Sequence, residues 1–467
     1  MFTDITLPSY ERYFYNKRTN IYGKSLLEVY NKNPLSKEGL KWFLELGYVP
    51  GHLTLFEDIE VISEFHIRKL KGNELKMETP FEIDALVDSS LHEGKSRKQL
   101  VTEGGNLFNQ VIDTLYSSKE KHVVLPLTSG LDSRMILGGL LACTEAKNLT
   151  ALTWGFPGSY DYETGIKISK KFGIKHHALN IDNYQITETR LMQFADASDC
   201  SVPLFDHWPK DWVKKIVDDL DGSLWMGLLG GTLSGSNLPH SFVDNPLAGF
   251  LKSNQRINSV ISLSAALLDD RPTIHDLNKL TANFKTVNSD TLDVYLHHHH
   301  LIAPTKIHRD LDYVLPFTDQ RLIQFFLSLP LEHRTNRGLL RDIIITQYPY
   351  LVKFPSNRNG GLGLDVHGKK RSLIKKYKQL FGKWDTPNMR RKYLSLNKLI
   401  QQDSKTSTLV DQKIEQLKTR NLLNPDALQI LQQEFKGIGV RTIDHSRAID
   451  ALVSLEMILE LVENKVT

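Results

Sequence analysis

The sequence predicts an α/β fold, with a parallel sheet covered by helices, a mainly helical C-terminal part and a small N-terminal α+β unit. Three observations support this prediction. Short apolar runs alternate with helical segments from His122 onward, as in parallel sheets with helical crossovers. From about Asp270 the pattern becomes mostly helical. The first 80 residues mix strand-like and helix-like segments without that alternation.

The N-terminal elements are short. Aromatic residues around a turn predict strand pairing within Tyr13–Tyr22, and Glu38–Leu46 predicts a helix. An extended run follows the Pro50-Gly51 turn and continues to Leu70. Leucines and a valine at roughly helical spacing then predict a linking helix within residues 80–120.

The alternating region supplies the predicted sheet. Its strand-like runs are His122–Leu127, Leu149–Trp154, His176–Ile181 and Ser223–Leu229, and its helical segments are Asp132–Cys143, Tyr162–Phe172 and Glu188–Ala197. Later helices are predicted at Asp319–Leu329, Leu339–Gln347 and Ala448–Val462. In folds of this kind, ligands bind at the carboxyl ends of the strands.

Composition narrows the class of protein. The chain has 467 residues, 40% of them hydrophobic and 24% charged, which excludes a mostly disordered or collagen-like chain. The net charge of +4 (58 − 54) gives no indication of nucleic-acid binding. Only two cysteines are present, and we find neither a signal core nor an apolar run long enough to span a bilayer. We therefore expect a soluble, cytoplasmic protein, and an enzyme rather than a fibrous protein.

The most informative segment is Leu125-Pro-Leu-Thr-Ser-Gly-Leu-Asp-Ser-Arg134. A strand ends in small and hydroxyl residues, and a helix begins beside Asp132, so free backbone amides and a helix N-terminus can face a phosphate. Asp132 is also a candidate ligand for Mg²⁺. An ordinary capped turn explains the same residues, since Ser and Asp often begin helices. The segment is not a Walker loop, and the sequence has no Gly-x-Ser-x-Gly elbow.

Four segments, in order along the chain, resemble the asparagine synthetase family. Thr128-Ser-Gly-Leu-Asp-Ser133 is similar to that family's pyrophosphatase loop, Ser-Gly-Gly-x-Asp-Ser. The other three are Tyr48-Val-Pro-Gly-His-Leu-Thr-Leu-Phe56, Asp312-Tyr-Val-Leu-Pro-Phe-Thr-Asp-Gln-Arg321 and Ala451-Leu-Val-Ser-Leu-Glu456. In that order, they resemble the end of the family's glutaminase domain, its Glu-x-Arg-x-Pro-Phe-Leu-Asp signature and the closing helix of its synthetase domain.

This resemblance implies an organisation and a fold. Residues 1–80 would be a truncated remnant of a class II glutamine amidotransferase domain. Residues 81–350 would form an ATP-binding domain of the pyrophosphatase-loop (adenine nucleotide alpha-hydrolase-like) type. Residues 351–467 would form the helical C-terminal part of the synthetase domain.

The resemblance also implies a chemistry. Family members use ATP and Mg²⁺ to adenylate a carboxylate, and ammonia or an amine then displaces AMP to form an amide. The implied nucleotide-binding residues are Thr128, Ser129, Gly130, Leu131, Asp132, Ser133, Leu152, Thr153 and Gly230, with Asp132 also holding the metal. The implied substrates are a small-molecule, glycan or peptide carboxylate and an amine donor.

The sequence departs from the family at the glutaminase half. The family's catalytic cysteine stands at position 2, where this chain has Phe2, and neither Cys143 nor Cys200 is near the N-terminus. Because Phe cannot act as a nucleophile, we expect no glutamine hydrolysis. Free ammonia, a substrate amine or a separate amidotransferase subunit would then supply the nitrogen.

The synthetase half also departs from the family pattern. Gly231 and Thr232 stand where a magnesium-binding Asp and a Glu are expected, which weakens the metal site. Asp312 replaces the Glu of the family signature, and Val314 stands where the signature has an Arg. The family's catalytic lysine corresponds to Arg358 or Lys353, so the implied catalytic residues are Asp312, Lys353 and Arg358.

Two interpretations follow. The chain is either a divergent amide ligase, or a catalytically decayed relative that binds nucleotide or acts as a scaffold in a surface-glycan or peptide-modification pathway.

Two further segments have alternative explanations. For His297–His300 we expect a solvated helix end rather than a metal site, because only the first and last share a helix face. Lys369–Lys378 carries six basic residues in ten. It predicts a solvated helix face or, alternatively, a surface for a phosphorylated substrate or an anionic membrane.

Overall fold

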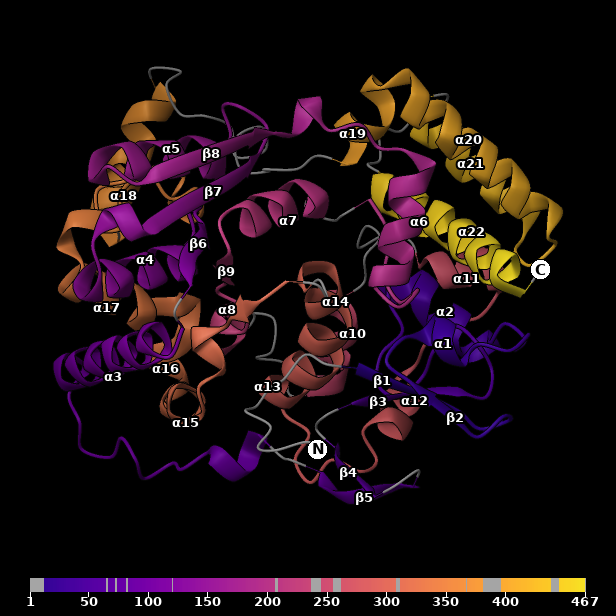
Figure 1. The fold of residues 1–467 in the computed structure, drawn as a ribbon, viewed down its shortest axis with the longest axis horizontal. Helices are drawn as coiled ribbons and strands as arrows, with labels where there is room; N and C mark the ends of the chain where they lie inside the picture. The colour runs from indigo at the N-terminus through magenta and orange to yellow at the C-terminus, as the bar shows by residue number, and fades with distance from the viewer. Residues whose placement is uncertain are drawn as a thin grey trace.

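The structure is a computed structural model of the 467-residue chain. It describes residues 12–466 (Figure 1), apart from 64–65, 72–73, 81–82, 120, 206–208, 237–244, 255–261, 308–310, 367, 381–395 and 438–444. The predicted α/β class is confirmed, because a parallel five-stranded sheet lies among many helices. Phe2 lies outside the described residues.

The central sheet has the strand order β10-β9-β6-β7-β8, and every neighbouring pair is parallel. Its strands are β6 (His122–Pro126), β7 (Leu149–Gly155), β8 (Lys175–Asn180), β9 (Gly222–Trp225) and β10 (Tyr313–Val314). The chain proceeds from β6 to β7 and β8 on one side, then returns to place β9 and β10 on the other. The order therefore reverses between β6 and β9, and such switch points are where open α/β sheets bind ligands.

Alternating side chains bury the two faces of this sheet. Val123 and Leu125 pack with α3 (Arg97–Ser117) and α4 (Leu131–Cys143), whereas Val124 packs with α7 (Lys210–Asp219) on the opposite face. This alternation is the period of two expected for a strand. The buried face of α3 begins at a capping box formed by Ser96 and Gln99, so the helix predicted within residues 80–120 starts only at Arg97.

The remaining helices surround this sheet and fill the other half of the molecule (Figure 1). Between β2 (Ile21–Gly23) and β10, the chain also forms α1 (Leu26–Val29), α2 (Lys37–Leu46), α5 (Tyr160–Phe172), α6 (Glu188–Ala197), α8 (Gly230–Leu233), α10 (Pro246–Asn254), α11 (Leu263–Leu268), α12 (Ile274–Leu280), α13 (Ser289–Leu292) and α14 (Ala303–Lys306). After β10 come α15 (Gln320–Leu327), α16 (Leu331–Arg334), α17 (Gly338–Gln347), α18 (Gly368–Leu380), α19 (Leu396–Gln402), α20 (Ser404–Thr419), α21 (Pro425–Phe435) and α22 (Ser446–Val466).

The N-terminal segment forms an antiparallel sheet of order β2-β1-β3, from β1 (Arg12–Asn16), β2 (Ile21–Gly23) and β3 (Ile59–Ser63). A separate hairpin pairs β4 (His66–Lys71) with β5 (Glu74–Pro80). Phe14 of β1 and Trp42 of α2 belong to the same apolar core as Leu452 of α22. This core therefore joins segments from both ends of the chain.

The predicted strands and helices agree well with the observed ones. Glu188–Ala197 matches α6 at both ends, and the predicted β6, β7 and β8 are displaced by at most one residue. The run predicted at Ser223–Leu229 is shorter, because β9 ends at Trp225 and the chain turns into α8. Among the described helices, none combines the length and apolar character needed to cross a bilayer.

Candidate functional site

The loop after β6 presents an uncapped helix N-terminus at the switch point. Gly130 is the N-cap residue of α4 and provides no side-chain cap. The turn is closed internally, because the Gly130 amide donates to Thr128 Oγ1 at 3.1 Å and the Thr128 amide donates to Ser133 Oγ at 3.2 Å. The amides of the first turn of α4 therefore lack a capping side chain, an arrangement that favours an anion.

Ser129 is buried and anchors the loop instead of facing outward. Its hydroxyl donates to Asp161 Oδ1 at 2.5 Å, and its amide donates to the same oxygen at 3.0 Å. The Asn357 amide donates to Ser129 Oγ at 3.1 Å. Burial raises the pKa of Asp161 above its ordinary value, although these hydrogen bonds oppose the shift.

Arg134 joins this loop to the segment that follows α17. Its guanidinium is fully buried and donates to the carbonyls of Ser129 at 3.2 Å and Phe354 at 3.0 Å, as well as to that of Pro355. Burial lowers the pKa of Arg134 to about 10, so it remains a cation at neutral pH. The predicted catalytic segment 353–361 is thereby held beside the loop.

Asp132 is engaged by an arginine that the sequence analysis did not identify. Arg337 donates to Asp132 Oδ2 from Nη1 at 3.0 Å and to Asp132 Oδ1 from Nη2. Its Nε donates to Ser234 Oγ at 2.7 Å. The Arg337 side chain is only 4% exposed, and that of Asp132 is 25% exposed. The arginine is therefore fixed by a bidentate pair at the rim of the loop.

The turn that carries Arg337 has an unusual backbone. Asn336 and Arg337 both have left-handed conformations, with φ of 54° and 59°. Asn adopts this region readily, but Arg does so only at a cost. Leu229, which precedes α8, also has a positive φ of 68°. Such residues are enriched at functional sites.

The charges of Arg337 and Asp132 both affect the pKa of Arg358. Its side chain is exposed, and its pKa is lowered from its ordinary value, chiefly by partial desolvation and secondly by the charge of Arg337. Asp132 opposes that shift. The charges of Arg337 and Asp132 thus act on Arg358 in opposite directions. Lys353 is exposed at the start of the same segment.

Two glycines after β9 allow the chain to pass close to Asp132 in the loop after β6. A Cβ added at Gly227 would lie 2.5 Å from Asp132 Cβ, and one at Gly230 would lie 2.5 Å from Asp132 Oδ1. Gly227 and Gly230 therefore lie directly against Asp132 of the loop. At Gly231 the nearest atom to an added Cβ is Ser236 Oγ, 3.3 Å away.

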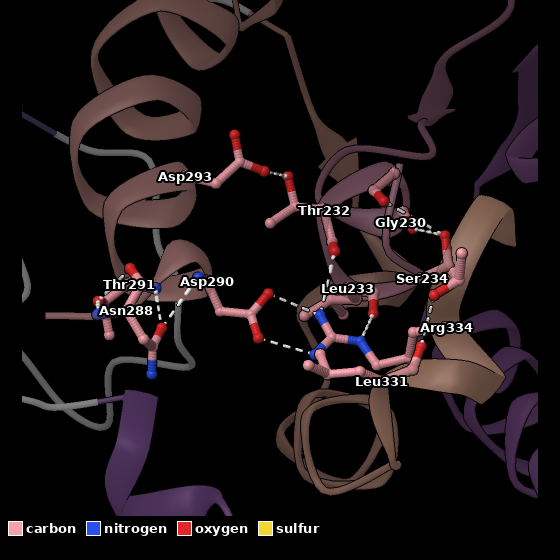
Figure 2. A network of polar contacts seen from close by, with 12 residues as sticks. Gly230, Thr232, Leu233, Ser234, Asn288, Asp290, Thr291, Asp293, Leu331 and Arg334 are labelled. Carbon is pink, nitrogen blue, oxygen red and sulfur yellow. Dashed lines mark hydrogen bonds and ion pairs between the residues drawn. The ribbon is translucent and has the colours of Figure 1, made fainter. Parts of the chain in front are cut away.

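A network of polar contacts surrounds the segment 230–234, which contains α8 (Figure 2). Arg334 donates to both carboxylate oxygens of Asp290 at 2.7 Å and to the Leu233 carbonyl at 2.9 Å. Thr232 donates to Asp293 Oδ2 at 2.7 Å. The position that the family pattern assigns to a glutamate is therefore occupied by a buried hydroxyl with a structural partner.

The histidine run is buried, which corrects the prediction of a solvated helix end. It lies in a π-helix, Asp293–Ile302, and His298, His299 and His300 are at most 6% exposed. The Leu229 amide donates to His298 Nε2 at 2.9 Å, so the His298 proton resides on Nδ1. Burial lowers the pKa of His298 to about 4. This neutral imidazole supports the strained turn before α8.

Leu152 and Thr153 lie at the base of the loop rather than on its open side. Both side chains are fully buried. The Thr153 hydroxyl donates to the Leu127 carbonyl at 2.7 Å, and the Leu127 amide donates to the Leu152 carbonyl at 2.7 Å. Leu131 is likewise part of the apolar core. These three side chains are therefore buried beneath the loop and help to position it.

Asp312 does not join the other predicted residues. It precedes β10, whose parallel register pairs Tyr313 with Leu224, so Asp312 lies at the amino edge of the sheet. There its carboxylate accepts from Lys119 at 2.8 Å and lies 3.6 Å from Lys121. The loop after β6 lies at the opposite edge. This geometry separates Asp312 from the site in which the sequence analysis placed it.

The donor set suits a phosphate better than a protein-held Mg²⁺. The described residues contain no group of three or more His, Cys, Asp or Glu side chains that could hold a metal. Asp132 already receives both guanidinium nitrogens of Arg337. Magnesium prefers several oxygen ligands in near-octahedral geometry. As the side chains lie, the residues do not fit that ion, and we derive no step through it.

No protein-family model matches the chain, and a search of curated proteins finds no similar sequence above the significance threshold. The resemblance to asparagine synthetases therefore depends on the four quoted segments alone.

Proposed function

We propose that the protein is an ATP-dependent, AMP-forming amide ligase without glutaminase activity. The observation that carries the proposal is the loop Thr128–Ser133. It combines an uncapped helix N-terminus at the switch point with two guanidinium groups, those of Arg337 and Arg358. That combination suits a polyphosphate. The resemblance of the loop to a pyrophosphatase loop gives the class of reaction.

The proposed reaction has two steps. A carboxylate oxygen of the substrate attacks the α-phosphorus of ATP, and the bond to the β-phosphate breaks to release pyrophosphate. Ammonia or an amine then attacks the acyl carbon of the adenylate, loses a proton, and expels AMP to leave an amide.

The residues of this chain would act mainly by stabilising negative charge on the nucleotide. The first-turn amides of α4 and the two arginines would stabilise negative charge that builds on the departing pyrophosphate. Arg358 is exposed and therefore accessible to a nucleotide, whereas Arg337 is fixed by Asp132 and Ser234. A guanidinium stays charged throughout, so neither group is proposed as a proton donor.

The nitrogen source follows from Phe2. Without a cysteine at that position we propose that free ammonia, a substrate amine or a separate amidotransferase subunit supplies the nitrogen. The carboxylate belongs to a small molecule, a glycan or a peptide. We also propose a cytoplasmic location, since the chain has only two cysteines, and the structure pairs neither in a disulfide.

A second candidate is supported by a specific observation. Asp132 is held by Arg337, and Gly231 provides no carboxylate nearby, so the acidic groups expected of an active relative are reduced. A protein of this kind would bind nucleotide without turnover and act as a scaffold or regulatory partner.

The experiment is a screen for AMP and pyrophosphate. Purified protein is incubated with ATP, Mg²⁺, ammonium and pools of carboxylic acids, and both products are quantified. The ligase predicts equal amounts of AMP and pyrophosphate, formed only with particular acids and strongly reduced by Arg358→Ala. ATP binding without either product from any pool, including amine-bearing acids, would support the second candidate. Release of ADP instead of AMP would contradict the ligase.

A further inference from the structure

One helix far from the C-terminal bundle displays an apolar stripe to solvent. Leu373, Tyr377 and Leu380 of α18 are 68%, 60% and 81% exposed. They are the three most exposed large apolar side chains among the described residues. Other exposed apolar side chains, such as Ile430 of α21, are scattered over different elements. In Figure 1, α18 lies at the edge of the molecule beside the central sheet, opposite the bundle of α20, α21 and α22.

The three apolar residues share one face of the helix. Their spacing of four and then three residues is the spacing of neighbours on an α-helical surface. Residues at these positions in a soluble helix normally face the core. Here all three are exposed, and they do not belong to the apolar cores that the described residues form.

The same helix is strongly basic. Residues 368–380 contain six Lys or Arg residues and no Asp or Glu. Lys369, Lys370 and Lys376 are exposed, and helical geometry places Lys370 and Lys376 on the two flanks of the apolar stripe. Lysines in such positions can extend their ammonium groups sideways while the apolar face is buried.

From this combination we infer that α18 docks the protein on an anionic lipid surface. The apolar stripe enters the interface between headgroups and acyl chains, and the flanking lysines contact acidic headgroups. A basic helix with one apolar face is the arrangement that binds membranes in the plane of the interface. A nucleic acid would account for the lysines but would leave the apolar stripe exposed.

The docking helix follows the candidate site closely in the chain. The segment that carries Arg358 leads directly into α18, and Asn357 in that segment contacts Ser129 of the loop. The inference stands independently of the proposed ligase reaction, since it depends only on the residues of α18.

The test is co-sedimentation with vesicles of phosphatidylcholine alone or mixed with phosphatidylserine. The full-length protein is expected to bind the acidic vesicles at least about tenfold more tightly, with affinity falling as salt is raised. The double variant Leu373→Ser/Tyr377→Ser and the triple variant Lys369→Gln/Lys370→Gln/Lys376→Gln should each lose about tenfold or more in affinity. The matched control Ile430→Ser should bind like the wild type.

Circular dichroism and thermal denaturation would verify that each variant is folded. Equal binding to both kinds of vesicle, or acidic-vesicle binding that both α18 variants retain, would overturn the inference. It would also be overturned if α18 captured an acidic protein or a nucleic acid but no vesicle.

Discussion

The two edges of the central sheet each carry a carboxylate paired with cations, yet they differ in construction. At the amino edge, Asp312 pairs with Lys119 and Lys121, and all three side chains are at least 31% exposed. At the carboxyl edge, Asp132 is held bidentately by Arg337, which is 4% exposed and has a left-handed backbone. A half-exposed lysine pair contributes little to stability. A pair with a buried arginine in a strained backbone conformation, at a switch point, has features that are enriched at binding sites.

The largest expected effect of a single substitution on stability is that of Arg337→Met. The change removes the cation but preserves most of the volume, and Asp132 and Ser234 lose their partner. Because Asp132 remains partly exposed, we expect the free energy of unfolding to fall by about 2–3 kcal/mol, somewhat less than for a fully buried pair. Urea denaturation at neutral pH measures it. A loss below about 0.5 kcal/mol would place this pair in the same class as the amino-edge pair.

The next effect is a pH dependence from His298. Its pKa in the fold is about 4, below the ordinary value of 6.5, because of burial. The unfolded chain therefore takes up the proton first as pH falls, and stability is lost between about pH 6.5 and pH 4. Protonation would also remove the acceptor for the Leu229 amide. Between pH 7.5 and pH 5, His298 should contribute about 2 kcal/mol of the loss.

His298→Gln separates this contribution from other titrations. Glutamine offers an oxygen to the Leu229 amide but does not titrate. The difference in unfolding free energy between pH 7.5 and pH 5 should be about 2 kcal/mol smaller for His298→Gln than for the wild type. An unchanged difference would mean that His298 does not govern the acid sensitivity of the carboxyl edge.

A smaller effect distinguishes two residues within one segment. Arg358→Ala removes a guanidinium whose pKa is affected by the charges of Arg337 and Asp132. The change should weaken ATP binding by about tenfold or slightly more. Lys353→Ala removes an exposed cation at the start of the segment and should change affinity by less than about threefold. Fluorescence titration with a labelled ATP analogue measures both. The opposite ranking would identify Lys353 as the phosphate contact.

The smallest effect is expected at the amino edge. Asp312→Asn breaks two partly exposed ion pairs and should lower the free energy of unfolding by less than about 1 kcal/mol. ATP affinity should not change, because Asp312 lies at the far edge of the sheet. Loss of ATP binding by a folded Asp312→Asn protein would instead indicate that Asp312 acts at the nucleotide site, as the family signature implies.

The sequence predicted the sheet well because its information is local. The apolar run His122–Leu127 marks a strand by its own residues, and the small and hydroxyl residues before Asp132 mark the turn that follows it. The loop Thr128–Ser133 was located for the same reason. Its internal hydrogen bonds join residues within a few positions of one another.

Other features depend on contacts that are distant in sequence. Arg337 meets Asp132 across 205 positions, and no local pattern marks it. The position of Asp312 at the amino edge cannot be inferred from the pattern, because β10 has only two residues and its direction and register leave no local signal. The histidine run was expected to be solvated because polar residues usually are, whereas here the Leu229 amide and surrounding apolar side chains bury it.

The central claim is that ATP phosphates bind at the carboxyl edge of the sheet. Isothermal titration with ATP, with and without Mg²⁺, on the wild type and two matched cation-to-methionine variants tests it most directly. Lys119→Met removes a cation at the amino edge, and Arg337→Met removes one at the carboxyl edge. We predict that Lys119→Met binds like the wild type and that folded Arg337→Met binds about 100-fold more weakly. Equal affinity of wild type and Arg337→Met, or loss of binding in Lys119→Met, would contradict the claim.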